Sequence, residues 1–164
     1  MKRIFLTGFM GSGKSTVGAV LAEQLKADFA DTDAYIEEKE AKRISDIFAE
    51  QGEAHFRSLE TKALEEVHER IVSTGGGIIE RPENIRLMKE KGIVVYLSTT
   101  FAEISRRLDE DETRPLWKQD LDGKKLLFSR RLPVYEQAAD IIVATDGRPA
   151  DDIAAEILHK LKEE

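Results

Sequence analysis

Apolar and polar positions alternate along this chain in blocks whose spacing switches between that of strands and that of helices. Short apolar runs predict five buried strands, at residues 4–6, 29–31, 71–73, 93–97 and 141–143. Between them, apolar residues recur at helical spacing, which predicts helices beginning near residues 14, 34 and 45, and others over 56–67, 82–91, 101–108, 126–138 and 149–162. Strands alternating with helices imply a parallel sheet covered on both faces, in a single α/β domain of residues 1–164.

Local signals locate several helix ends. Ser45 is a candidate N-cap for the helix that follows it. Pro82 and Gly92 stand at the start and just past the end of another helix, which is the usual arrangement of these two residues. Pro133 predicts a break or a kink in the helix over residues 126–138.

Residues 109–124 interrupt the pattern, because they are polar and show no clear periodicity. A segment of this length without regular structure, inside a compact domain, is usually a lid over a binding site or a disordered segment. We expect a lid at about residues 109–124.

The stretch GFMGSGKST at residues 8–16 matches the phosphate-binding pattern G-x-x-x-x-G-K-[ST], and it lies between a predicted strand and a predicted helix. Its glycines let backbone N–H groups point at an anion, and the positive end of the helix dipole faces the same place. Lys14 would reach the β- and γ-phosphates, and the Ser15 hydroxyl would ligate Mg²⁺. The sequence therefore predicts binding of a nucleoside triphosphate by Gly11, Ser12, Gly13, Lys14, Ser15 and Thr16.

The composition argues against several classes of binding partner. The 164 residues have a formal net charge of −7, which argues against a nucleic-acid partner. There is no cysteine, and this excludes disulfides and thiolate metal sites. No apolar run approaches the roughly 20 residues of a membrane span, and the first strand begins too early for a signal peptide, so we expect a cytoplasmic protein without a membrane partner. Since no apolar surface stripe is left unassigned, we also expect a monomer.

Two carboxylates, Asp31 and Asp33, follow the second predicted strand, at the edge of the sheet where such folds bind ligands. In an extended segment, side chains one residue apart point in opposite directions, so we expect different roles for them. Asp31 would face Mg²⁺ through a bound water, because Mg²⁺ usually keeps several waters. Asp33 would face a second substrate, and the alternative for Asp33 is the N-cap of the following helix.

The sequence resembles the shikimate kinase family from Ile4 to about Leu161. The phosphate loop is common to many kinases, but the resemblance also rests on DTD at 31–33, GEAHFRSLE at 52–60, STGGG at 73–77, TRPL at 113–116 and RLPVY at 131–135. The resemblance implies a doubly wound, nucleoside-monophosphate-kinase-like P-loop fold. It also implies transfer of the ATP γ-phosphate to the 3-hydroxyl of shikimate, with Mg²⁺ as the cofactor.

On the acceptor side, the resemblance implies that Asp33 hydrogen-bonds the shikimate hydroxyls and that Glu60 holds Arg57 in place. Two arginines that clamp the shikimate carboxylate and three glycines whose backbone lines the pocket complete the set: Arg57, Arg131, Gly75, Gly76 and Gly77. The chemistry agrees, since a planar guanidinium suits a carboxylate and bare glycine backbone lets a ring approach closely. No histidine is implicated, so Asp33 is the only candidate general base, and orienting the hydroxyl is its main expected task.

On the nucleotide side, the resemblance places Arg107 against the adenine, with Arg106 as the alternative, and Arg148 at its border. Arg114 would reach the γ-phosphate from the lid, which makes Lys14, Asp33 and Arg114 the expected catalytic residues. Ser73 stands where many phosphate-loop enzymes have an aspartate, so the magnesium site depends on Ser15 and Asp31.

Two other functions share part of this pattern. A kinase for gluconate or a nucleoside monophosphate would share the loop and the fold, but would have no reason to combine Asp33, Arg57, three glycines and Arg131. A regulatory module that binds nucleotide without transferring phosphate is expected to have lost Lys14, Asp31 or Asp33, and all three are present.

Overall fold

The computed structural model describes residues 2–110 and 120–164, and within them the sheet has five parallel strands. The strands are β1 (Arg3–Thr7), β2 (Phe29–Asp31), β3 (Ile71–Ser73), β4 (Gly92–Ser98) and β5 (Ile141–Ala144). Their order in the sheet is β2-β3-β1-β4-β5, so β1 lies at the centre between β3 and β4. The predicted parallel sheet is confirmed.

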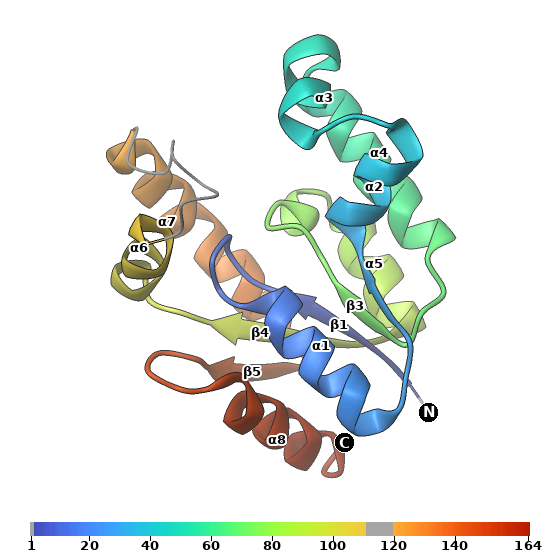
Figure 1. Cartoon of the computed structure of the whole chain (residues 1–164), viewed down its shortest axis with the longest axis vertical. Helices are drawn as coiled ribbons and strands as arrows, with labels where there is room; N and C mark the ends of the chain where they lie inside the picture. The colour runs from blue at the N-terminus through green and yellow to red at the C-terminus, as the bar shows by residue number, and fades with distance from the viewer. Residues whose placement is uncertain (1, 111–119) are drawn as a thin grey trace.

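Helices connect the strands and cover both faces of the sheet (Figure 1). They are α1 (Lys14–Leu25), α2 (Thr32–Glu40), α3 (Ile44–Gln51), α4 (Glu53–Glu66), α5 (Pro82–Lys91), α6 (Phe101–Asp109), α7 (Leu121–Ala138) and α8 (Ala150–Leu161), with a short 3₁₀ helix η1 (Ile78–Glu80). Within the described residues, no helix is long and apolar enough to cross a membrane.

The alternation of side chains along the strands divides the core into two layers. Leu6 and its neighbours on the same face of the sheet pack against Leu21 of α1 and Ile157 of α8. Phe5, one residue earlier, points to the other face, where Met88 of α5 and Tyr135 of α7 belong to the same cluster. Because strands buried on both faces need apolar residues at every position, the continuous apolar runs of the sequence are explained by this arrangement.

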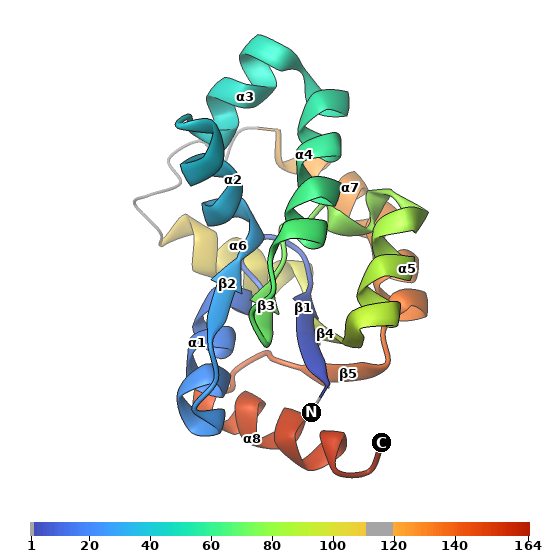
Figure 2. The same cartoon turned by 90° about the vertical axis from the view of Figure 1, so that its right-hand side faces the viewer.

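A third, smaller core holds α2, α3 and α4 together as a lobe, which Figure 2 shows at the top of the molecule beyond β2 and β3. Ile36, Ile47 and Phe56 are buried in it, and the rings of Phe48 and Phe56 lie 4.8 Å apart. Gly52 joins α3 to α4 with a φ of 84°, which explains a glycine at this junction. The lobe fixes the position of α4, the helix that contains Arg57.

One predicted helix feature is wrong and another is only partly tested. The α3 helix begins at Ile44, because the N–H groups of Asp46 and Ile47 bond to the carbonyl of Arg43, so Arg43 is at the N-cap position and Ser45 lies inside the helix. The α7 helix continues through Pro133, so of the predicted break or kink the structure excludes the break. On either side of the proline, Arg131 donates to Glu80 and Tyr135 donates to the carbonyl of Gly76, and these contacts hold α7 against η1 and the glycine turn.

The two helices on either side of the predicted lid extend into the range of residues 109–124. Asp109 is the last residue of α6, and α7 begins at Leu121 rather than near residue 126. The Asp120 side chain caps α7 by accepting a hydrogen bond from the N–H of Gly123 at 3.2 Å. The rest of the predicted lid, including Arg114, lies outside the described residues, and the lid stays a prediction.

Candidate active site

A single cleft of about 1140 Å³ brings the predicted nucleotide and acceptor residues together. The phosphate loop, α6 and the start of α8 line one part of it. The other part is lined by the lobe of α2, α3 and α4, by the glycine turn after β3 (Gly75, Gly76 and Gly77), and by Arg131 of α7. The polar residues that follow separate strands in the sequence therefore meet at one site, as expected for the carboxyl ends of parallel strands.

The phosphate loop, residues 8–16, has the backbone that its glycines allow. Gly11 and Gly13 have φ angles of 80° and 92°, in the left-handed region that other residues rarely adopt. The α1 helix begins at Lys14, so its N-terminal N–H groups face the loop. The Lys14 ammonium donates hydrogen bonds to the carbonyls of Gly8 and Phe9, the latter at 3.2 Å. The predicted loop residues Gly11, Ser12, Gly13, Lys14, Ser15 and Thr16 all line the cleft.

Hydroxyl and carboxylate oxygens meet beside the loop. Ser15 Oγ donates to Asp31 Oδ2 at 2.7 Å and lies 3.4 Å from Ser73 Oγ. No group of three or more His, Cys, Asp or Glu side chains in the described part of the chain is arranged to hold a metal. Oxygen ligands from one hydroxyl and one carboxylate nevertheless fit Mg²⁺, which takes its remaining ligands from water and nucleotide phosphates.

Asp31, the last residue of β2, and Asp33 face different neighbours, but the predicted reason, an extended backbone through both residues, is wrong. Asp31 is the N-cap of α2 and accepts a hydrogen bond from the N–H of Ala34 at 3.1 Å, so capping is the role of Asp31 and not of Asp33. Asp33 lies in the first turn of α2 rather than in an extended segment. Its carboxylate faces the glycine turn, since a Cβ atom added to Gly75 would lie 2.6 Å from Asp33 Oδ1.

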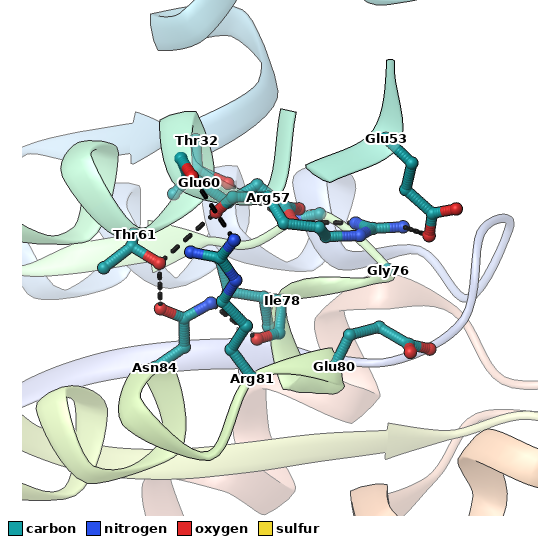
Figure 3. Close-up of polar contacts among 12 residues, drawn as sticks. Thr32, Glu53, Arg57, Glu60, Thr61, Gly76, Ile78, Glu80, Arg81 and Asn84 are labelled. Atoms are coloured by element: carbon teal, nitrogen blue, oxygen red, sulfur yellow. Dashed lines mark hydrogen bonds and ion pairs between the residues drawn. The ribbon is translucent and has the colours of Figure 1, made fainter. Parts of the chain in front are cut away.

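Arg57 of α4 is held between two carboxylates of its own helix (Figure 3). Its Nη1 donates to Glu60 Oε1 at 2.7 Å and its Nη2 to Glu53 Oε1 at 3.4 Å. The Glu60 side chain is 1% exposed, and this burial raises the pKa of its carboxyl even though Arg57 favours the charged form. Burial opposes the charge of Arg57 as well, but its hydrogen bond and ion pair with Glu60 raise the pKa of the guanidinium. The expected Glu60–Arg57 contact is confirmed.

Arg131 of α7 approaches the same glycine turn, formed by Gly75, Gly76 and Gly77, at Gly76. Its side chain is 7% exposed, and its Nε donates to Glu80 Oε1 at 2.8 Å. A Cβ atom added to Gly76 would lie 3.4 Å from Arg131 Nη1. Glu80 was not predicted as a site residue, and no motif in the sequence singles it out.

On the nucleotide side, the structure separates the two arginines that the sequence left as alternatives. Arg107 donates through Nη1 to the carbonyl of Gly11 at 3.1 Å and through Nη2 to that of Thr145 at 3.3 Å. Arg106 is 57% exposed and pairs with Glu103 and Glu110. The geometry therefore favours Arg107, which links the phosphate loop to the loop after β5.

Glu103 is a second residue that the sequence analysis missed. It accepts hydrogen bonds from Arg106 Nη2 at 2.6 Å and from Arg107 Nε at 3.0 Å. The bond from Arg106, together with that from Arg107, lowers the pKa of Glu103 to about 2. Its position four residues before Arg107 on a helix was the available signal.

Arg148 also lines the cleft, after β5, as predicted. Its Nη1 donates to the carbonyl of Ala144 at 2.7 Å and lies 2.8 Å from Glu156 Oε1. The fold and this cleft together define a phosphate-loop kinase, whose cleft also contains two arginines, Arg57 and Arg131, suited to a small anionic acceptor.

Comparisons with known proteins agree with this class. Residues 10–162 match the family model described as shikimate kinase. A shikimate kinase of Sulfurihydrogenibium sp. (strain YO3AOP1) is 46% identical over 165 residues, covering 99% of each chain. The solved structure of an Acinetobacter baumannii shikimate kinase in complex with shikimate has a TM-score of 0.91 at 38% identity, over 99% of this chain and 94% of that one. An Aquifex aeolicus shikimate kinase has a TM-score of 0.86 at 39% identity, over 98% and 96% of the two chains.

The chain belongs to the shikimate kinase family. It is a P-loop kinase that uses ATP to phosphorylate shikimate, a step of aromatic amino acid biosynthesis.

Proposed function

We propose that this chain transfers the γ-phosphate of ATP to the 3-hydroxyl of shikimate with the acceptor held between Arg57, Arg131 and the glycine turn. The observation that supports this best is the pair of largely buried guanidinium groups, from α4 and α7, that lie against the bare backbone of Gly77 and Gly76. Two such cations suit a small acceptor that has one carboxylate.

The nucleotide phosphates bind in the phosphate loop. Backbone N–H groups of residues 11–16 and the N-terminus of α1 face the β-phosphate, while Lys14 exchanges its loop carbonyls for phosphate oxygens. Arg107 and Arg148 border the adenine. Arg114, outside the described residues, is proposed to reach the γ-phosphate from the lid. Stabilisation of the charge that develops on the transferring group is the main contribution of these cations.

Asp33 is proposed to orient the attacking hydroxyl. It lies on the acceptor side of the cleft, against Gly75, where a shikimate hydroxyl could reach both its carboxylate and the phosphate loop. A loose transition state for phosphoryl transfer demands little proton abstraction before the bond to phosphorus forms. Positioning is therefore the larger part of its contribution, and the proton leaves to this carboxylate late in the transfer.

Ser15 and Asp31 would hold Mg²⁺, with Asp31 acting through a bound water. When bound, the ion neutralises charge on the β- and γ-phosphates. The contact between Ser15 Oγ and Asp31 Oδ2 keeps both oxygens in place before the nucleotide arrives.

The experiment measures ADP release with ATP and Mg²⁺, with no acceptor and then with shikimate, gluconate or a nucleoside monophosphate, and phosphorus NMR locates the phosphate on the product. We expect turnover with shikimate alone and a 3-phosphate product. Turnover only with gluconate or a monophosphate would contradict the acceptor assignment, and nucleotide binding without turnover would indicate a regulatory module.

We also propose that the chain acts as a monomer in the cytoplasm, with neither nucleic acid nor membrane as a partner. The net charge of −7 and the absence of an unassigned apolar stripe support this. Sedimentation equilibrium at working enzyme concentration tests the monomer, and cell fractionation tests the location.

A further inference from the structure

Glu80, at the end of η1, contacts Arg131 of the cleft, and nothing above assigns a task to its carboxylate. We propose that Glu80 is a positioning residue that fixes Arg131 in the direction needed to bind the acceptor's carboxylate. The proposal rests on the proposed role of Arg131 in shikimate binding, and it adds a specific requirement to it.

The contacts of Glu80 single out Arg131 as its main partner. Glu80 Oε1 accepts from Arg131 Nε at 2.8 Å and from Arg130 Nη2 at 3.4 Å. The Arg131 side chain is 7% exposed and that of Arg130 is 68% exposed, so solvent screens the second pair much more than the first. Burial disfavours the ionised form of Glu80, but the hydrogen bond and charge of Arg131, with those of Arg130, lower its pKa.

The bond through Nε determines where the rest of the guanidinium points. Because the group is planar, fixing Nε on Glu80 fixes the plane of the guanidinium and directs Nη1, which is cis to Cδ, away from that carboxylate. Arg131 Nη1 is close to the glycine turn, 3.4 Å from where a Cβ of Gly76 would be, and Arg131 lines the cleft. The face of the group packs on the ring of Phe9, with Cζ 5.8 Å from the ring centroid. Nη1 thus faces the glycine turn, where the acceptor is proposed to bind.

Glu80 is itself held by a chain of buried hydrogen bonds. Its N–H donates to the carbonyl of Gly77 at 3.0 Å, which closes η1 on the glycine turn. Asn84, which is fully buried, donates to the carbonyl of Ile78 at 3.0 Å and accepts from Thr61 Oγ1 at 2.7 Å. Figure 3 shows Asn84, Thr61 and Ile78 joined in this way, with the carboxylate of Glu80 directed away from Asn84. The support of Glu80 therefore reaches α4 and α5.

This arrangement gives the pocket a matched pair of supports, since Arg57 depends on Glu60 as Arg131 depends on Glu80. An arginine side chain that is not held loses conformational entropy when it binds a ligand, and this weakens binding. Arg131, which is fixed by Glu80, has already lost this conformational entropy when the chain folds. Removing the Glu80 charge should consequently weaken acceptor binding, although it also removes a negative charge from the neighbourhood of an anionic substrate.

The test measures kcat, the KM values for shikimate and ATP, and the ADP affinity for wild type and Glu80→Gln. We expect Glu80→Gln to raise the shikimate KM about five- to tenfold, the effect of weakening one charge-assisted hydrogen bond. The kcat, the ATP KM and the ADP affinity should stay within about twofold of wild type, because the nucleotide side is untouched. An unchanged or lower shikimate KM would overturn the proposal.

Two matched controls remove a charge nearby without touching Arg131. Glu83→Gln removes an exposed carboxylate that lies 3.6 Å from Arg81, and Arg130→Ala removes the exposed partner of Glu80. Both should leave the shikimate KM within about twofold of wild type. If either raises it as much as Glu80→Gln does, the effect is one of general charge or stability, and the proposal is wrong.

The Arg131→Ala background separates this proposal from the assignment on which it rests. If Arg131→Ala leaves the shikimate KM unchanged, the proposed role of Arg131 itself fails. If Arg131→Ala raises the KM and Glu80→Gln does not, only the role of Glu80 fails. We expect both to raise it, and Glu80→Gln to add nothing when Arg131 is already alanine. Should Glu80→Gln not fold, Glu80→Asp, whose carboxylate is one methylene shorter, is measured with the same expectations.

Discussion

The guanidinium of Arg57 lies directly over the backbone of Gly77, because a Cβ atom added to Gly77 would be 2.1 Å from Arg57 Nη1. Gly77 has a φ of −90°, which any residue can adopt, so backbone strain does not explain a glycine here. The close approach of the Arg57 guanidinium explains the glycine. The position of the Arg57 guanidinium over the acceptor pocket thus depends on the absence of a side chain at Gly77, twenty residues further along the chain.

Gly77→Ala should raise the shikimate KM on the order of tenfold or more, because the methyl group displaces Arg57 by about an ångström or breaks its bond with Glu60. Steady-state kinetics with shikimate as the varied substrate measures the effect. Gly76→Ala is the comparison, since its Cβ would find its nearest neighbour at 3.4 Å. An equal or larger effect of Gly76→Ala would show that displacement of Arg57 is not the cause.

Lys14→Ala should lower kcat on the order of a hundredfold or more, because the ammonium stabilises charge on the transferring phosphoryl group. The fold should survive, because the Lys14 ammonium lies at the loop, where it donates to the carbonyls of Gly8 and Phe9, and not in the apolar core. Circular dichroism checks the fold, and Lys42→Ala, which removes an exposed pair with Glu50, is the control. Near-normal turnover by a folded Lys14→Ala protein would contradict the assignment of Lys14.

Asp31→Asn should increase the Mg²⁺ concentration that gives half-maximal activity, on the order of tenfold, because a neutral amide attracts a hydrated dication less. Asparagine is as good an N-cap as aspartate, so α2 should keep its start and the effect should not be one of helix stability. Asp46→Asn, in the first turn of α3, is the control. A magnesium requirement unchanged by Asp31→Asn would remove Asp31 from the metal site.

The phosphate loop, Glu80 and the N-cap of α2 differ in how far the sequence could predict them. The phosphate loop was predictable because its glycines, lysine and hydroxyls are adjacent in the chain and their spacing is fixed by one ligand. Glu80 was not, because its partner Arg131 is 51 positions away and the bond forms only when η1 and α7 pack together. The sequence left capping of α2 open as an alternative role for Asp33, whereas Asp31 caps the helix, because only the backbone decides which of the two positions is extended.

The carboxyls of Glu60 and Glu80 should make opposite contributions to the pH dependence of stability. Burial raises the pKa of Glu60 above its ordinary value of 4.5, so its contribution is present below that value and is lost as the pH rises through the raised pKa. The pKa of Glu80 is lowered from 4.5 because Arg131 and Arg130 outweigh its burial. The contribution of Glu80 is therefore present above 4.5 and is lost as the pH falls through the lowered pKa.

Urea unfolding of wild type, Glu60→Gln and Glu80→Gln between about pH 4 and about pH 8 measures these contributions. The stability of wild type relative to Glu60→Gln should fall as the pH rises. Relative to Glu80→Gln it should fall as the pH drops toward the acid end of the range. Parallel slopes for the two variants would show that at least one of the pKa shifts has the wrong sign.

Arg107 and Arg106 offer the last test, because they are adjacent on α6 and share Glu103 but differ in what else they contact. Arg107 joins the carbonyl of Gly11 in the phosphate loop to that of Thr145 after β5, whereas Arg106 pairs with Glu103 of α6 and with Glu110 at its C-cap. Arg107→Ala should therefore weaken ADP binding on the order of tenfold, since it removes both a cation from the nucleotide side and the link between two loops that line it. Arg106→Ala should change ADP affinity by no more than about twofold, because its ion pairs are exposed.

Isothermal titration with ADP and Mg²⁺ measures the ADP affinity of both variants, and the shikimate KM should not change in either variant. A larger effect of Arg106→Ala would reverse the assignment, and equal effects would mean that Glu103, which both arginines hold, and not Arg107 organises this side of the cleft.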